Sequence, residues 1–93
     1  MAVLGGWDIS GLKGCNLPQR AQSAFTAVTS ELTGADYEPV LYVGKQQVNG
    51  TNYCILALQT LVTAVPKKRL VKMIINESSL GECSLVSVSV INI

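Results

Sequence analysis

The chain has 93 residues, of which 48% are hydrophobic and 14% are charged, and its formal net charge is +1. This length predicts a single domain spanning residues 1–93, and the low charged fraction excludes an intrinsically disordered chain. The near-neutral charge also argues against a nucleic-acid partner, because binding phosphates requires a basic excess.

The three cysteines, Cys15, Cys54 and Cys83, are an odd number without metal-ligand spacing, and the chain has no histidine. A Cys or Ser nucleophile ordinarily needs a base such as imidazole, and the carboxylates are scattered singly along the chain. We therefore expect no metal site, no cofactor and no catalytic constellation, so the protein is not expected to be an enzyme.

The first predicted element is an amphipathic helix. Asn16 is the expected N-cap, with Gln19 as its capping-box partner and Pro18 in the first turn, and Gly34 is the expected stop. Apolar residues follow at the spacing of one helical face, namely Ala21, Ala24, Phe25, Val28 and Leu32. The pattern predicts a helix of about four turns.

After the helix the apolar residues alternate with period 2, which is typical of strands. The predicted strands are residues 40–47, 51–62, 70–75 and 84–93, joined by a hairpin at Asn49-Gly50 and by turns at 66–68 and 76–81. Residues 7–9 form a weaker candidate strand. The expected fold class is α+β, with one long helix packed across a four- to five-stranded antiparallel meander.

Two segments of the chain resemble motifs of one protein family. The run Gln46-Gln47-Val48-Asn49-Gly50 matches the Gln-x-Val-x-Gly first hairpin loop of the cystatins, and Val3-Leu4-Gly5-Gly6 resembles their apolar N-terminal trunk ending in glycine. The continuation Thr51-Asn52-Tyr53 is similar to the stefins, the single-domain intracellular branch. The second hairpin departs from the family, since residues 77–81 keep Leu80 but lack proline, and the connection at 64–69 is longer than in a stefin.

The resemblance implies a cystatin-like fold and a reversible, competitive inhibitor of papain-like cysteine proteases. In such inhibitors the trunk and two hairpin loops enter the active-site cleft without being cut. Glycines let the backbone approach the cleft, apolar side chains fill its pockets, and Gln46 holds the hairpin in shape. The implied protease-binding residues are Val3, Leu4, Gly5, Gly6, Gln46, Gln47, Val48, Asn49, Gly50, Ser79 and Leu80.

Each part of this site also has a purely structural alternative. Asn49-Gly50 can be an ordinary hairpin turn, Val3 and Leu4 a frayed terminus, and Leu80 an edge contact to the core. The predicted second strand is apolar on both faces, although the helix can cover only one. The alternative function is therefore a self-associating scaffold or interaction protein without protease inhibition, forming a homodimer that includes the domain-swapped type.

Two sequons, at Asn49 and Asn76, would carry glycans beside the hairpin loops in a secretory pathway. The opening residues lack the pattern of a signal peptide, and no stretch reads as a transmembrane helix. We therefore expect a cytoplasmic protein with no membrane partner and with reduced thiols. Cys54 and Cys83 fall on the second and fourth strands of the expected meander, too far apart for a disulfide.

Overall fold

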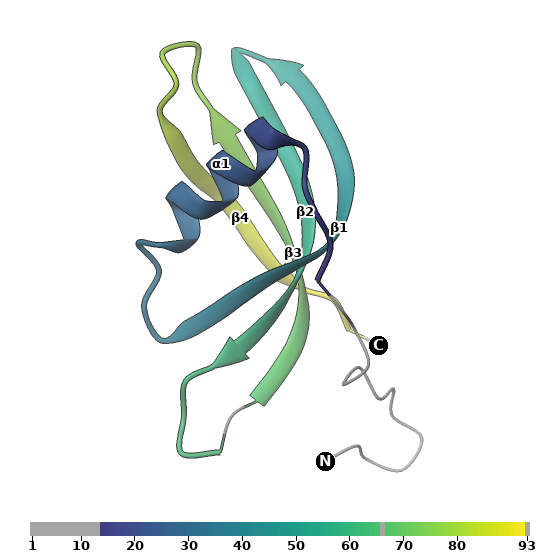
Figure 1. The fold of residues 1–93 in the computed structure, drawn as a ribbon, viewed down its shortest axis with the longest axis vertical. Helices are drawn as coiled ribbons and strands as arrows, with labels where there is room; N and C mark the ends of the chain where they lie inside the picture. Colours follow the sequence, from purple (N-terminus) through teal and green to yellow (C-terminus); the bar gives the residue numbers. More distant parts are fainter. Residues whose placement is uncertain (1–13, 66, 93) are drawn as a thin grey trace.

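The structure, a computed structural model, describes residues 14–65 and 67–92, which form one helix and four strands (Figure 1). The strands make a single antiparallel sheet in the order β1-β2-β3-β4, and the helix lies across one side of it. The elements are α1 (Gln19–Thr29), β1 (Ala35–Val48), β2 (Gly50–Leu61), β3 (Lys67–Glu77) and β4 (Cys83–Val90). The predicted α+β meander is confirmed, whereas the candidate strand at 7–9 lies outside the described residues.

The helix begins later than predicted. Pro18 is the N-cap residue, with extended φ and ψ of −52° and 148°, and no side chain caps the helix. The predicted capping box of Asn16 and Gln19 is therefore wrong. Two constraints keep the preceding residues extended: proline disfavours a helical conformation at Leu17, and the Cys15 amide donates to the Pro39 carbonyl at 2.8 Å.

The helix also ends earlier than predicted, after 11 residues or about three turns. The hydroxyls of Thr29 and Ser30 donate back to the carbonyls of Phe25 and Ala27, at 2.8 and 3.0 Å, near the end of the helix. Gly34 has a positive φ of 85°, but it introduces β1 instead of terminating the helix, and its carbonyl accepts from the Val62 amide at 2.9 Å.

The core lies between α1 and the side of the sheet that faces it, which we call the inner face. The predicted apolar side of the helix is confirmed as buried, and Leu32 packs against it in part. Alternate residues of β2 and β3 meet the helix. The buried cluster comprises Ala21, Ala24, Phe25 and Val28 of α1 with Tyr53, Ile55, Ala57, Val71, Met73 and Ile75 of the sheet.

Strand β1 begins at Ala35, five residues before the predicted start at 40, and it contains two register shifts, at Pro39/Leu41 and Tyr42/Gly44. Each shift adds a residue without a cross-strand partner and so reverses the phase of the inside–outside alternation. Because the alternation of inward- and outward-facing residues changes phase twice along β1, the sequence pattern does not predict one continuous strand. In contrast, β4 ends at Val90, short of the predicted end.

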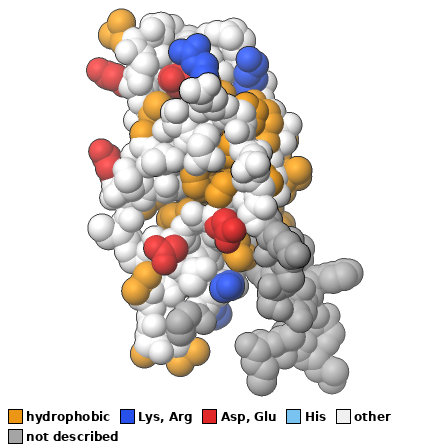
Figure 2. Space-filling model, viewed as in Figure 1, with side chains coloured by type: hydrophobic (Ala, Val, Ile, Leu, Met, Phe, Trp, Pro, Cys, Tyr) orange, Lys and Arg blue, Asp and Glu red, His pale blue; other side chains and the backbone are white. Residues whose placement is uncertain are grey.

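We call the side of the sheet opposite α1 the outer face. The register places Cys54, Leu56 and Leu58 of β2 on this face, and Cys54 and Leu56 are half-buried while Leu58 is buried. Figure 2 shows the other side, where hydrophobic side chains gather in the middle and charged ones are scattered around them. No helix in the described part of the chain is long and apolar enough to cross a membrane.

We expect Phe25→Ala to lower the free energy of unfolding by about 3–5 kcal/mol, because Phe25 is only 3% exposed and its ring joins the helix to the sheet. Urea unfolding followed by circular dichroism measures the change. Ser23→Ala, at an exposed position of the same helix, is the control and should change the stability by less than about 0.5 kcal/mol. Equal effects of the two substitutions would contradict the described packing.

Candidate functional site

The two hairpin loops lie together at one end of the sheet (Figure 1). The β1–β2 chain reversal is at Asn49, and the β3–β4 loop spans residues 78–82. Thr51 pairs with Glu77 across the β2–β3 ladder, which places both loops at the same level. The structure thus brings together the two hairpins that the sequence marked as protease-binding, residues 46–50 and 79–80.

The predicted hairpin turn at Asn49-Gly50 is present, and its glycine is the residue with a positive φ. Gly50 has a φ of 102°, but no described residue other than glycine has a positive φ. Val48 pairs with Gly50 across the reversal at Asn49, and Gly50 is the residue of this turn that lies in the left-handed region. The Gln47 side-chain amide donates to the Gly50 carbonyl at 2.9 Å and closes the loop.

Gly50 is the point of contact between the two hairpins. A Cβ at this position would collide with the Glu77 carbonyl oxygen and lie 3.0 Å from the Ser78 Cα. The positive φ and this close approach both require glycine. The structure therefore gives Gly50 an internal role that the sequence motif alone does not reveal.

Gln46 takes part in a row of side-chain amides on the outer face. Asn76 donates to the Asn52 Oδ1 at 2.9 Å, and Asn52 donates to the Gln46 Oε1 at 3.4 Å. The row crosses β3, β2 and β1 directly below the hairpin tips. Gln46 is thereby linked across the hairpin, as expected for a residue that holds the hairpin in shape.

The β3–β4 loop is organised by Ser78, which the sequence analysis did not select. Its hydroxyl accepts hydrogen bonds from the amides of Leu80 and Glu82, at 3.2 and 3.1 Å. Its carbonyl accepts from the Gly81 amide at 2.9 Å, and Gly81 has a φ of 86°. Serine followed by glycine three residues later is a β-turn signature, so the sequence did contain the signal.

Both hairpin tips expose apolar side chains. Leu80 is 86% exposed and Val48 is 43% exposed, and Ser79 beside Leu80 is also exposed. The alternative in which Leu80 contacts the core is therefore wrong. Residues 46–50 and 79–81 include no charged side chain. The end of the sheet thus presents two adjacent loops with uncharged tips, each with one exposed aliphatic residue, and the charged Glu82 lies where the second loop joins β4.

The trunk residues Val3, Leu4, Gly5 and Gly6 lie outside the described residues. Gly14, the first described residue, lies beside the Glu38 side chain near the start of β1. Ten residue steps separate Leu4 from Gly14, a fully extended reach of about 33–36 Å. Nine steps of strand separate Pro39 from Val48, about 30 Å. The trunk would therefore have to be almost fully extended to reach the hairpin tips.

A cluster of polar groups supports the hairpins from the inner face, and the sequence analysis did not anticipate it. The Tyr53 hydroxyl donates to the Glu77 Oε1 at 3.0 Å, and the Arg20 Nε lies 3.8 Å from the same oxygen. Burial raises the pKa of Tyr53, and the hydrogen bond and negative charge of Glu77 raise it further. Burial, followed by the Glu77 charge, likewise raises the pKa of the Cys83 thiol.

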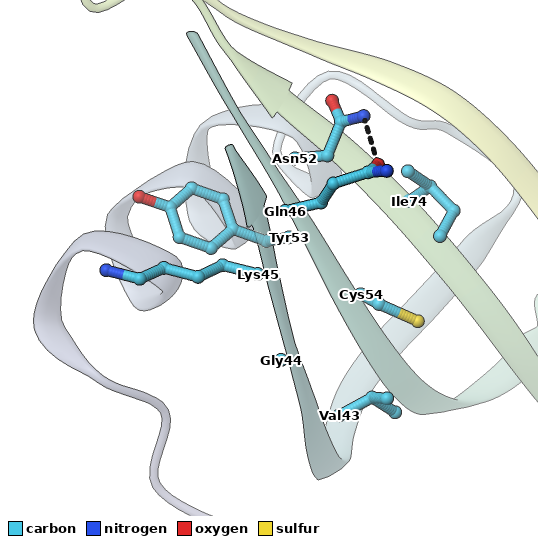
Figure 3. Close-up of a pocket in the computed structure, with 8 residues that line it drawn as sticks. All are labelled: Val43, Gly44, Lys45, Gln46, Asn52, Tyr53, Cys54 and Ile74. Carbon is cyan, nitrogen blue, oxygen red and sulfur yellow. Dashed lines mark hydrogen bonds between the residues drawn. The ribbon is translucent and has the colours of Figure 1, made fainter. Parts of the chain in front are cut away.

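The outer face has a depression of 310 Å³ below the first hairpin (Figure 3). Gln46, Asn52, Cys54 and Ile74 point to one side of the sheet there, while Lys45 and Tyr53 extend to the other. Beside the depression, Leu41 and Val43 are 52% and 56% exposed. The sequence predicts that the second strand is apolar on both faces, and the exposed side chains of Leu41 and Val43 add apolar area on the neighbouring strand β1.

No group of three or more His, Cys, Asp or Glu side chains that could hold a metal ion occurs within residues 14–65 and 67–92. Comparisons with protein-family models, with curated proteins and with solved structures find no match to this chain.

We expect Gly50→Ala to destabilise the protein more than Gly81→Ala. Both glycines have positive φ, which costs an L-residue about 1–2 kcal/mol, but a Cβ at Gly81 has no neighbour within 4 Å, whereas one at Gly50 collides with the Glu77 backbone. The difference in the free energy of unfolding between the two variants measures the close approach of the hairpins. Equal destabilisation would show that the hairpins do not touch.

We expect the stability to fall as the pH rises above about 9. The pKa values of Cys83 and Tyr53 are raised from their ordinary values of 9.0 and 10.0, so the folded protein keeps protons that the unfolded chain releases. The stabilisation from each proton is complete at pH values below the ordinary pKa of the group. It is lost as the pH rises through the raised pKa of the folded protein. Urea unfolding at pH 8 and pH 10.5 measures the decline.

Tyr53→Phe is the matching variant, because it removes the titrating hydroxyl and keeps the ring. Its stability should decline less between the two pH values than that of the unmodified chain. An identical decline would show that the Tyr53–Glu77 contact does not control the alkaline stability.

Proposed function

We propose that this protein is a reversible, competitive inhibitor of papain-like cysteine proteases with a cystatin-like fold. The observation that carries the proposal is the placement of two hairpin loops side by side, with Val48 and Leu80 exposed at their uncharged tips. The Gln-x-Val-x-Gly pattern at 46–50 and the single helix across an antiparallel meander add support.

The geometry of the tips suits occupancy of a cleft. The side chains of Gln47 and Ser78 bond to the backbone of their loops, and Gly50 lies against the Glu77–Ser78 backbone, so little conformational entropy is lost on binding. Val48 and Leu80 offer apolar area to the pockets on either side of the protease nucleophile. The two loops fill the active-site cleft and exclude substrate. They are not cut, because no peptide bond of the loops lies in the position that the protease cleaves.

The trunk adds affinity in this proposal only if Val3 and Leu4 reach the hairpin end. The extended reach from Gly14 is about as long as the distance along β1, so this engagement requires an extended segment. Binding would then order that segment, which offsets part of the gain from burying Leu4 and Val3.

We also propose a cytoplasmic location. Cys15, Cys54 and Cys83 are free thiols, and Cys54 and Cys83 lie on opposite faces of strands separated by β3. A reducing compartment suits these thiols, and it leaves Asn49 at the hairpin tip without a glycan that would block the cleft.

The second candidate function is an interaction protein that does not inhibit proteases, and the outer face favours it. Leu41 and Val43 are more than half exposed there, beside the half-buried Leu56 and the depression near Cys54. A partner or a second copy of the chain would cover this apolar area.

The test is a titration of papain with the folded monomer, isolated by size. We expect competitive inhibition, and we expect Leu80→Ala to weaken it about tenfold or more, since burying a leucine contributes about 1.5–3 kcal/mol. Val65→Ala is the control, because Val65 is 79% exposed in the connection at the opposite end of the sheet. It should leave the inhibition constant unchanged.

Deletion of residues 1–5 tests the trunk, and faster dissociation is expected if Val3 and Leu4 bind. An unchanged inhibition constant would show that the two hairpins suffice. Full protease activity in the presence of excess folded monomer would disprove the inhibitor proposal and favour the interaction protein.

A further inference from the structure

The two edges of the sheet differ in how well they are protected against pairing with another strand. Strand β1, at one edge, has two register shifts and contains Pro39 together with charged residues. The carbonyl of Pro39 also accepts a hydrogen bond from the Cys15 amide at 2.8 Å. Proline, charges and irregular register are the usual features that prevent edge pairing.

Strand β4, at the other edge, has none of these protections along most of its length. Residues 83–90 contain no proline and no charged side chain, and serine alternates with valine over residues 87–90. Its one register shift lies opposite Ile74/Ile75, so the segment from Ser87 to Val90 is regular. Within residues 14–65 and 67–92, no backbone hydrogen bond joins another element to the far edge of this segment.

The free backbone groups of this edge can be identified. The Ile91 amide donates to the Leu70 carbonyl at 2.9 Å, so Ile91 points its hydrogen-bonding groups toward β3. In an antiparallel ladder alternate residues point the opposite way. The amides and carbonyls of Val88 and Val90 therefore point away from β3, where they can bond to a further strand.

We propose that β4 pairs antiparallel with β4 of a second copy, about a two-fold axis at Ser89, and joins the two sheets into one. Val88 of each copy then lies opposite Val90 of the other on the inner face, and the two residues exchange backbone hydrogen bonds. The two Ser89 side chains meet on the outer face. This interface concerns the edge of the sheet, is separate from the hairpin tips, and does not rest on protease inhibition.

Two features favour a second copy of the chain as the partner of β4: the absence of like charges close to each other across the interface, and the single open edge that limits association to a dimer. The nearest charged residue on the outer face, Lys72, is the β3 partner of Ser89. The two copies of Lys72 would lie three strand spacings apart, about 14 Å, beyond the screening length of about 8–10 Å. The pairing is self-complementary, and because β1 is protected, the described part of each chain offers one open edge, so association closes at a dimer.

The full chain is tested by sedimentation at increasing concentration, and a species of twice 9.9 kDa is expected. Ser89→Lys places like charges directly opposite each other at the axis and should shift the equilibrium toward monomer. Ser84→Lys is the matched control: Ser84 is exposed on the same strand and face, but lies beyond the paired segment. It should leave the dimer intact.

A cross-link tests the register. Opposed residues in a non-hydrogen-bonded pair have Cα atoms about 4.5 Å apart, within the range of a disulfide. Ser89→Cys should therefore form an intermolecular disulfide between the two introduced thiols, identified by peptide mapping, and Ser84→Cys should not. A chain that stays monomeric, or a dimer that persists with Ser89→Lys and forms no such disulfide, would overturn the proposal.

Discussion

The structure depends on one constraint: a single helix of 11 residues covers one face of a four-stranded sheet. The inner face gains its buried cluster from Phe25 and Val28 above Ile55, Met73 and Ile75. No helix of residues 14–65 or 67–92 covers the outer face, and there Leu41 and Val43 stay exposed. The helix leaves three parts of the sheet uncovered: the hairpin tips, the outer face and the edge of β4.

The hairpin end is rigid because neighbouring backbones and side chains constrain it from several directions. Gly50 packs against the Glu77–Ser78 backbone, and the amide row through Asn52 links three strands below it. On the inner face, Tyr53 donates to Glu77, which also lies close to Arg20 at the start of the helix. The helix, the central strands and both loops therefore stabilise the same small region, which suits a surface that binds without changing shape.

The protection of the two sheet edges follows from how the chain enters and leaves the sheet. The segment before the helix runs beside β1, where Cys15 bonds to Pro39, and it covers part of that edge. Strand β4 is the last element, so no later described element covers it. A meander of this order thus has one covered edge and one open edge, unless another chain pairs with the open one.

The sequence by itself determined the element types, their order and the apolar side of the helix, because the 3.6 and 2.0 periodicities and the turn residues are local signals. It also located both hairpin turns, although β3 continues to Glu77, inside the second predicted turn. Only the tertiary structure shows that the segment before α1 is bonded to β1, since the Cys15 amide donates to the Pro39 carbonyl, a contact that no periodicity records. The same holds for the two phase reversals in β1 and for the contact that requires glycine at position 50, because each depends on residues from another strand.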